Sequence, residues 1–406
     1  MLVAFLLPVT LSARLVPLGL AVDSTRIRRV VQSGQAAFER DRRRVLPVTT
    51  GGLGRCEERI GRFCYWYDET EPPPPPEPQA LTRRREQWLG ELSLAATQLP
   101  GDGWIAGQLV RYLVEAGRPD SAAAAASRCR AEGWWCLALA GFANHAGGHF
   151  VTSDSLFRLA MGAMPPGERC RWNDLEVMLE PPEARDYGAL DCRGRDSANA
   201  VLLWRGQPRQ GQGPTGNDLR TEILSRRVIL RSLDGAVTHH GIRLGHDLAE
   251  VVLRYGWAEA YGRRPDRPGA QNDGIDVVGH EPKPAYPLLA PDPGWPARLE
   301  RPRFRYAPRH VARIDQLRDV QLARFWRGSS VVLVGGYQVP LDSVFPSDTL
   351  AAALVVSGHM GNAAAIHQAR LGRRGSIKSD PVAGASRASL ELFDPSGRGL
   401  AVYRSP

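Results

Sequence analysis

The stretch "FANHAGGHFVTSDSLFRLAMGAMP", residues 142–165, constrains the fold of this chain more than any other. Its apolar residues recur at helical spacing and are interrupted once by a glycine pair, which predicts two helices with a turn between them. Glycine is expected where the backbone bends, so we assign the turn to Gly148. Proline cannot continue a helix, so Pro165 marks the end of the second helix. The stretch therefore predicts a helical hairpin.

Similar glycines occur at a fixed distance along this region. Gly103 and Gly133 each precede a tryptophan, and Gly117 and Gly147 each follow an alanine, with the same spacing in both pairs. Self-similarity at a period of about 20–50 residues is typical of stacked helical units. The region is therefore predicted to contain helical hairpin repeats, and a plain, non-repeating helical bundle remains the alternative.

Residues 142–165 resemble the second half of a tetratricopeptide repeat. The residues that carry the resemblance are Gly141, Gly148, Phe150, Phe157, Ala160 and Pro165. The resemblance implies that Gly141 lets the two helices approach closely, and that Phe157 and Ala160 pack on the inner face of the second helix. The preceding unit keeps Trp104, Tyr112, Gly117 and Ala122. The four aromatic residues Trp134, Trp135, Phe142 and Phe157 are predicted to be core.

The N-terminus and the cysteines both favour export. "MLVAFLLPVTLSARLVPLGLAVDS" contains an apolar run and small residues near position 21, which predicts a signal peptide over residues 1–21, with a buried N-terminal helix or strand as the alternative. Six cysteines allow 15 connectivities, and the short loops favour three local pairs. These pairs are Cys56 with Cys64, Cys129 with Cys136, and Cys170 with Cys192. Disulfides would place the protein in the periplasm, at the cell surface or in the medium, whereas free thiols would fit the cytoplasm.

The pattern along the chain predicts an α+β multidomain protein. Its predicted segments are a signal peptide (1–21), a basic helix over about 25–44 within a cysteine-containing segment that ends in the spacer "EPPPPPEPQ" (22–79), tetratricopeptide-like helical repeats (80–179), a small middle helical domain (180–262), a Pro/Gly-rich linker (263–303) and an antiparallel β-sandwich (304–406). Residues 180–216 are expected to be rich in loops.

The last hundred residues predict β-structure. "VQLARFWRGSSVVLVGGYQV" predicts a hairpin with its turn at Arg327-Gly328, and "DTLAAALVVSG", "AAAIHQARL", "ASLELFD" and "GLAVYR" predict further strands. Short strands at regular spacing are typical of antiparallel sandwiches.

The middle segment predicts two helices, "NDLRTEILSRRVILRSL" and "LGHDLAEVVLRYGW". It resembles bacterial exported proteins that carry the Gly-Trp-x-Thr-Asp domain. The matching residues are Asn217, Asp218, Arg220, Glu222, Arg254, Tyr255, Gly256 and Trp257. Where the namesake motif has Thr-Asp, this chain has Glu259-Ala260. The resemblance supports the architecture and export of the chain, and the family has no assigned activity that could be transferred to it.

Six polar residues of this segment form the candidate site. They are Asn217, Asp218, Arg220, Glu222, Asp247 and Arg254. The five charged residues among them can form an ion-pair network with Arg226 that clamps two helices. The alternative is a polar pocket for an anionic ligand or peptide, with Arg220 and Arg254 as a fork.

Metal and cofactor signatures are not found in the sequence. "THHGIRLGHD" contains His239, His240, His246 and Asp247, but the spacing is not that of a zinc motif, and we predict no metal. No Walker loop, dinucleotide-binding glycine motif or nucleophile elbow occurs, and we predict no cofactor.

The net charge of +9 is spread over scattered arginines and forms no concentrated patch, so nucleic acid is not expected as a partner and membrane contact is peripheral at most. These features favour an exported, non-enzymatic scaffold that binds a protein or peptide through a helical-repeat surface. One alternative is an envelope hydrolase that acts on peptide or polysaccharide with acid and base groups of the middle domain. Another is a protein that binds an anionic polymer through its arginines.

Overall fold

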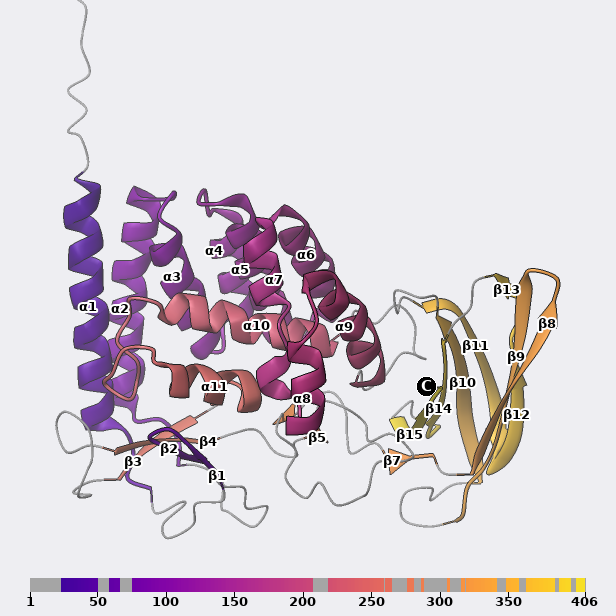
Figure 1. The fold of residues 1–406 in the computed structure, drawn as a ribbon. Coiled ribbons are helices and arrows are strands. Elements are labelled where there is room, and N and C mark those ends of the chain that lie inside the picture. Colours follow the sequence, from indigo (N-terminus) through magenta and orange to yellow (C-terminus); the bar gives the residue numbers. More distant parts are fainter. Residues whose placement is uncertain are drawn as a thin grey trace, which may run out of the picture.

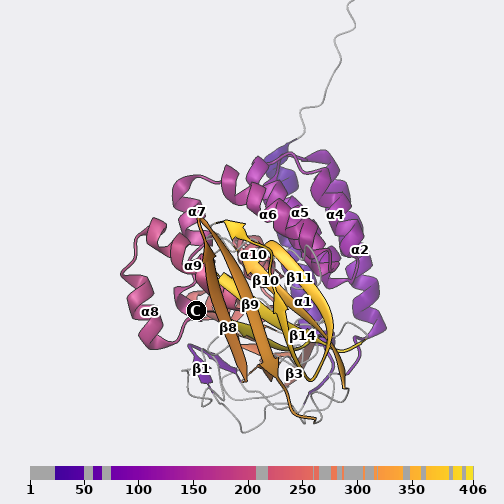
Figure 2. The same cartoon turned by 90° about the vertical axis from the view of Figure 1, so that its right-hand side faces the viewer.

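The computed structural model describes residues 23–49, 58–65, 75–206, 218–258, 260–264, 276–280, 286–287, 305–306, 315–317, 319–341, 348–357, 363–383, 387–395 and 399–405. Within these residues the fold is mixed: eleven α-helices precede a set of mainly antiparallel sheets in the C-terminal half (Figure 1). Figure 2 looks at the molecule from the sheet end, with the helices behind the strands. The predicted signal peptide, residues 1–21, lies outside the described residues.

Six helices form the N-terminal array. They are α1 (Ser24–Val45), α2 (Gln79–Gln98), α3 (Gly103–Glu115), α4 (Pro119–Ser127), α5 (Gly133–Ala146) and α6 (Phe150–Ala163). The predicted basic helix is confirmed as α1. Aspartates begin two of these helices, because the carboxylates of Asp23 and Asp102 accept hydrogen bonds from backbone N–H groups of the first turn.

The predicted hairpin at residues 142–165 is confirmed as α5 and α6. Gly148 lies between them with φ +77°, a conformation that favours glycine. A Cβ atom added at Gly141 would lie 3.0 Å from the ring of Phe157, so the two helices touch at this point. Ser153 Oγ donates to the carbonyl oxygen of Gly141 at 2.7 Å and closes the same contact. All four aromatic residues that were predicted to be core are buried: Trp134, Trp135, Phe142 and Phe157.

Two of the predicted cysteine pairs are formed. Cys129 and Cys136 join the end of α4 to the start of α5, and Cys170 is joined to Cys192. The remaining predicted pair, Cys56 with Cys64, involves a residue outside the described part of the chain. Two disulfides fit an oxidising compartment rather than the cytoplasm.

The expectation of loops over residues 180–216 is wrong for the part that the structure describes. After α7 (Pro166–Trp172) and the 3₁₀ turn η1 (Glu176–Met178), this part forms α8 (Pro181–Gly188) and α9 (Cys192–Gly206). Asp191 Oδ1 accepts from the backbone N–H of Gly194 at 2.7 Å and caps α9, a signal that the sequence interpretation missed.

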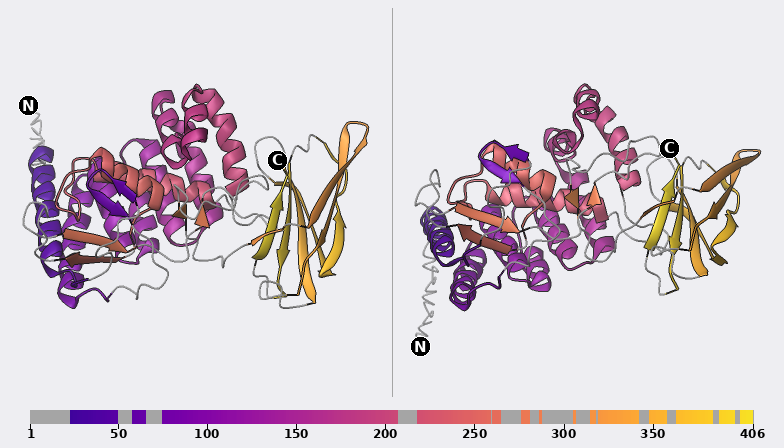
Figure 3. Two further views of the ribbon diagram at one scale, coloured as in Figure 1. Left: turned by 60° about the horizontal axis from the view of Figure 1, so that its bottom comes forward. Right: turned by 90° about the horizontal axis from the view of Figure 1, so that it is seen from below.

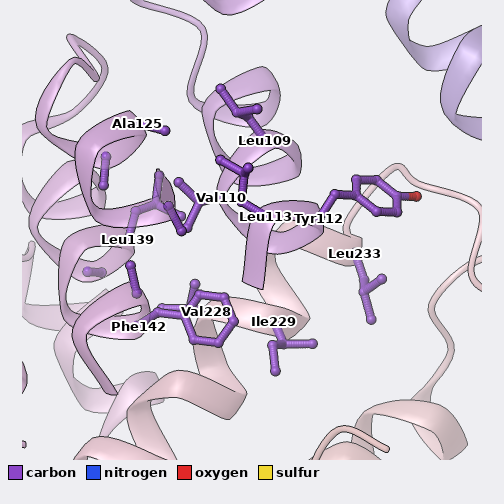
Figure 4. Close-up of a cluster of buried hydrophobic side chains, with 14 of the residues drawn as sticks. Leu109, Val110, Tyr112, Leu113, Ala125, Leu139, Phe142, Val228, Ile229 and Leu233 are labelled. Carbon is purple, nitrogen blue, oxygen red and sulfur yellow. The ribbon is translucent and has the colours of Figure 1, made fainter. Parts of the chain in front are cut away.

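Helices α10 (Asp218–Leu233) and α11 (His246–Tyr255) confirm the two predicted helices of the middle segment. Helix α10 packs against α3, α5, α6 and α11. In Figure 4, Val228 and Ile229 of α10 lie beside Phe142 of α5 and near Leu113 of α3. One hydrophobic core thus crosses residue 180, the predicted boundary between the repeat segment and the middle segment.

Three small two-stranded sheets lie within or after the helices. They pair β1 (Glu58–Ile60) with β2 (Phe63–Tyr65), β3 (Ala260–Arg264) with β4 (Asp276–His280), and β5 (Tyr286–Pro287) with β6 (Arg305–Tyr306). The described part of the predicted linker therefore includes β4, and Val277 of this strand packs into the helical core.

Two larger sheets form the C-terminal part. Their strands are β7 (Asp315–Gln316), β8 (Val320–Arg327), β9 (Ser330–Gln338), β10 (Thr349–Ser357), β11 (Ala363–Gly372), β12 (Arg374–Lys378), β13 (Val382–Ala383), β14 (Arg387–Phe393) and β15 (Gly399–Arg404). One sheet has the order β11-β10-β14-β15-β7, in which only the β15–β7 pair is parallel, and the other has β9 between β12 and β8, with β13 also on β9. The predicted hairpin is confirmed as β8–β9, with Gly328 at φ +60° in its turn.

The two larger sheets share one apolar core. Leu333 and Tyr337 of β9 belong to the same buried cluster as Leu354 of β10 and Leu390 of β14. Gly335 lies against Leu354 and Leu390, because a Cβ atom there would come within 3.5 Å of both side chains. The helices contact this part through α9: Arg387 Nη1 donates to the carbonyl of Ala200 at 3.2 Å. Figure 3 shows the two parts side by side.

Candidate functional site

Arg220 and Glu222, two of the predicted site residues on α10, bind partners on the neighbouring hairpin. Arg220 donates through Nε and Nη2 to the carboxylate of Asp154 on α6, at 2.8 and 2.7 Å. Glu222 lies 2.8 Å from His145 Nε2 on α5 and accepts from Arg226 Nε at 2.6 Å. The start of α10 is thus held to both helices of the α5–α6 hairpin.

The charge on Glu222 is stabilised by these contacts. Burial raises the pKa of its carboxyl group, but the positive charge of Arg226 and the hydrogen bond from His145 outweigh burial and lower the pKa to about 2. Glu222 is therefore ionised at any physiological pH. A carboxylate held in this way serves as a fixed ion-pair partner, and it is a poor proton donor or acceptor.

The predicted residues of α11 bind the β1–β2 hairpin. Arg254 Nη2 donates to both carboxylate oxygens of Glu58 at 2.6 Å, and its Nη1 donates to Glu250 at 2.9 Å. Asp247 accepts from Arg62 Nε at 2.7 Å. Burial raises the pKa of Asp247 slightly, but hydrogen bonds from Arg62 lower it below its ordinary value. Both residues therefore attach a cysteine-containing hairpin to α11.

The five described residues of the predicted site make these contacts in separate places. Asp218 is buried at the start of α10, where its charge acts on Arg404 of β15, and Asn217 lies outside the described residues. The fork of Arg220 and Arg254 does not form, because each guanidinium is bound to a different carboxylate. The predicted network is thus divided into local clamps between α10 and the α5–α6 hairpin, and between α11 and the β1–β2 hairpin.

Sequence interpretation missed a group of buried polar side chains between α1 and α3. This buried Arg–Glu cluster consists of Glu39 and Arg42 on α1, Arg111, Tyr112 and Glu115 on α3, and His239, Trp257 and Tyr261. Tyr112 Oη donates to Glu39 at 2.5 Å. Glu115 accepts from Arg42 and Arg111, both at 3.0 Å. Two acids and two arginines therefore balance each other's charge beneath the surface.

Aromatic rings complete the buried Arg–Glu cluster. The guanidinium of Arg111 lies 4.0 Å from the ring centre of Tyr112, and that of Arg42 lies 4.8 Å from the ring centre of Tyr261. The imidazole of His239 packs 4.2 Å from the Tyr261 ring. Burial, together with the charges around it, lowers the pKa of His239 well below its ordinary value, so this imidazole is neutral at pH 7.

The carboxyl groups of this cluster differ in their titration. Burial raises the pKa of Glu39, whereas at Glu115 the positive charges of Arg42 and Arg111 outweigh burial and lower the pKa. A carboxyl group with a raised pKa is also found in general acids. Glu39, Arg111 and Tyr112 are, however, almost fully buried, so no substrate reaches these groups in this structure. The geometry assigns the cluster to holding α1 against α3.

A signal for this cluster was present in the sequence. Arg111 interrupts the apolar run "LVRYLV" of α3, and Glu39 and Arg42 lie one turn apart on the buried side of α1. Charged residues inside an apolar helix face are rarely buried unless they are paired. One acidic partner of Arg111, Glu115, lies a single turn along α3. The contacts that join α1 to α3, such as that of Arg42 with Glu115, link residues 73 apart, so sequence spacing does not reveal them.

The histidines of "THHGIRLGHD" do not gather around a metal position. The ring centres of His239 and His240 lie 4.1 Å apart with the rings tilted by 49°, and Asp247 is bound to Arg62. In the part of the chain that the structure describes, no group of three or more His, Cys, Asp or Glu side chains is arranged to hold a metal ion.

A shallow cavity of about 290 Å³ lies on the sheet that contains β10, β11 and β14. It is lined by Ala351, Ala352, Ala353, Gln368, Ala369, Arg370 and Phe393. This lining has one charged group and no acid–base pair, so it offers no catalytic arrangement.

Comparison with known proteins finds no match: no family model, no curated protein and no solved structure is similar to this chain at a significant level.

Proposed function

We propose that this protein is an exported, non-enzymatic scaffold of the cell envelope that binds a protein or peptide through its helical hairpins. In this proposal α3–α4 and α5–α6 are two tetratricopeptide-like repeats, and the two C-terminal sheets form a β-sandwich. The proposal is supported by the contacts of the candidate polar residues, which are made within the chain and not with an open pocket. Arg220, Glu222, Asp247 and Arg254 each bind a partner within the chain and join its elements.

The partner surface cannot be the inner face of α3 and α5, because α10 packs against it. The outer face of α6 is open instead. Val151 and Leu159 are 47% and 61% exposed, and Ser155 between them completes a stripe at i, i+4 and i+8. Exposed apolar side chains along one helix face favour contact with another protein or peptide. We assign the partner surface to this stripe.

The test is capture of partners from envelope extract with the mature chain. The proposal predicts saturable, salt-resistant binding of a protein that is lost in Val151→Ser/Leu159→Ser. The matched control is Val30→Ser/Leu94→Ser, which changes two side chains that are 64% and 62% exposed on α1 and α2. Equal binding by both variants, or binding that disappears at high salt, would overturn the assignment.

The hydrolase alternative makes a different prediction for the same polar residues. An enzyme would keep its folding and lose turnover in Asp218→Asn or Asp247→Asn. The scaffold would lose only stability in these variants, because Asp247 binds Arg62 and Asp218 is a buried charge.

A further inference from the structure

The tip of the β8–β9 hairpin exposes two aromatic side chains to solvent. Trp326 is 71% exposed and Phe325 is 54% exposed. They are the two aromatic members among the strongly exposed large apolar residues in the described part of the chain. Burying such a side chain is worth about 1.5–3 kcal/mol, so their exposure in the isolated chain favours a binding role.

Each face of the hairpin carries one aromatic side chain and one arginine. Successive side chains of a strand point to opposite faces, so Trp326 shares one face with Arg324, and Phe325 shares the other with Arg327. All four residues are exposed. A groove on a protein covers one face of such a ribbon, whereas a lipid interface surrounds the tip and contacts both faces at once.

The positive charge of the hairpin favours a negatively charged partner. The residues from Val320 to Gln338 include Arg324 and Arg327 and no acidic residue. Within the described residues β8 pairs only with β9, so its other edge faces outward. Pairing of this edge with a second copy would bring arginines together, which is unfavourable. An anionic surface is complementary in charge.

The position of the hairpin allows such contact. Figures 1 and 3 place β8 and β9 at the end of the molecule that lies farthest from α1. No helix of the described residues is long and apolar enough to cross a bilayer. Tryptophan prefers the interface between lipid and water, and arginine binds lipid phosphates.

We propose that the tip of the β8–β9 hairpin docks on an anionic phospholipid bilayer, with Phe325 and Trp326 in the interface and Arg324 and Arg327 on headgroup phosphates. This proposal goes beyond the scaffold function and does not depend on it, because the helical stripe and the hairpin are separate surfaces.

The experiment measures sedimentation of the full mature chain with vesicles of phosphatidylcholine, alone or with about one third phosphatidylglycerol. We expect binding to the anionic vesicles only. Phe325→Ser/Trp326→Ser should weaken it at least tenfold. Arg324→Gln/Arg327→Gln should weaken it by about fivefold per arginine, because each basic residue near an anionic surface contributes about 1 kcal/mol.

Matched controls separate the tip from general surface effects. Val30→Ser/Leu94→Ser removes exposed apolar side chains elsewhere, and Arg29→Gln/Arg83→Gln removes the same charge from exposed positions on α1 and α2. Both controls should bind as the unchanged chain does. Circular dichroism should show that the tip variants stay folded, because all four substituted side chains are exposed.

Three results would overturn the proposal. One is an unchanged chain that does not bind the anionic vesicles. Another is an equal loss of binding in the tip variants and their controls. The third is a dimer in sedimentation velocity that dissociates in Phe325→Ser/Trp326→Ser, which would show that a second copy covers the tip. Failure of partner capture by the helical stripe would leave the vesicle result standing.

Discussion

Replacing Gly141 with alanine tests whether close contact between α5 and α6 is the reason for the glycine. The added Cβ atom would lie 3.0 Å from three carbons of the Phe157 ring, which is fully buried, so the ring would have to shift by a few tenths of an ångström within the core. Alanine in a helix is favoured over glycine by about 1 kcal/mol, and overpacking a core costs about 1–3 kcal/mol. The variant should therefore be up to about 2 kcal/mol less stable than the unchanged chain.

The control is the same substitution at Gly90 in α2, where nothing lies within 4 Å of the added atom. Gly90→Ala should raise the free energy of unfolding by up to about 1 kcal/mol. The two alanine variants should thus differ by about 1–3 kcal/mol in urea unfolding. Substituting Phe157 by leucine should reduce the penalty at Gly141, since the smaller side chain leaves space.

Equal stabilisation by both alanines would refute the reasoning. It would mean that α5 and α6 do not approach closely at Gly141, and that the glycine has no role in packing the hairpin.

The remaining predictions concern ionised groups. Burial lowers the pKa of His240 from 6.5 to about 3, so between these values the unfolded chain binds a proton that the folded chain does not, and this residue should make stability fall with falling pH by about 1.4 kcal/mol per unit. The pKa of His239 is lowered in the same direction, so His240→Asn should reduce the slope in a pH series of urea unfolding by about this amount and leave the contribution of His239. The pKa of Glu222 is lowered from 4.5 to about 2, so the contribution of its carboxylate to the free energy of unfolding is complete above pH 4.5 and disappears towards pH 2. Glu222→Gln should be about 2–3 kcal/mol less stable than the unchanged chain at pH 7. The stabilities of the two proteins, measured by urea unfolding, should converge in acid. Arg220→Met should destabilise the folded chain by about 2 kcal/mol, because it removes the main partner of the buried carboxylate of Asp154. The double variant Arg220→Met/Asp154→Leu should recover most of this loss in thermal melts. If the losses of the two single variants instead add in the double variant, the pairing is contradicted.

The elements that could be predicted from the sequence are those with strong local signals. Helices α1, α10 and α11 and the β8–β9 hairpin follow from apolar periodicity, and the turn at Gly148 follows from the freedom of glycine. The two disulfides that the structure describes close loops of 7 and 22 residues, which short-range closure favours. Helix α8 and the first part of α9 were missed, because polar residues predominate there and only a few apolar side chains, such as Tyr187 in α8, are buried.

The candidate site could be predicted only in part, because the ion-pair partners of charged residues are close in space and can be far away along the sequence. Sequence reasoning placed Arg220 and Arg254 in one network, since both lie in the same short segment. Their actual partners, Asp154 and Glu58, lie 66 and 196 residues away. The ion pair between Arg42 on α1 and Glu115 on α3 was missed for the same reason, since it can be found only once the two helices are known to be adjacent.

The disulfide between Cys129 and Cys136 joins α4 to α5 and fits an oxidising compartment. The most direct measurement is peptide mapping of the chain recovered from cells whose thiols were alkylated before lysis. We expect one peptide pair linked through Cys129 and Cys136 and a separate pair linked through Cys170 and Cys192. Alkylated Cys129 and Cys136, or a link from either of them to another cysteine, would contradict it.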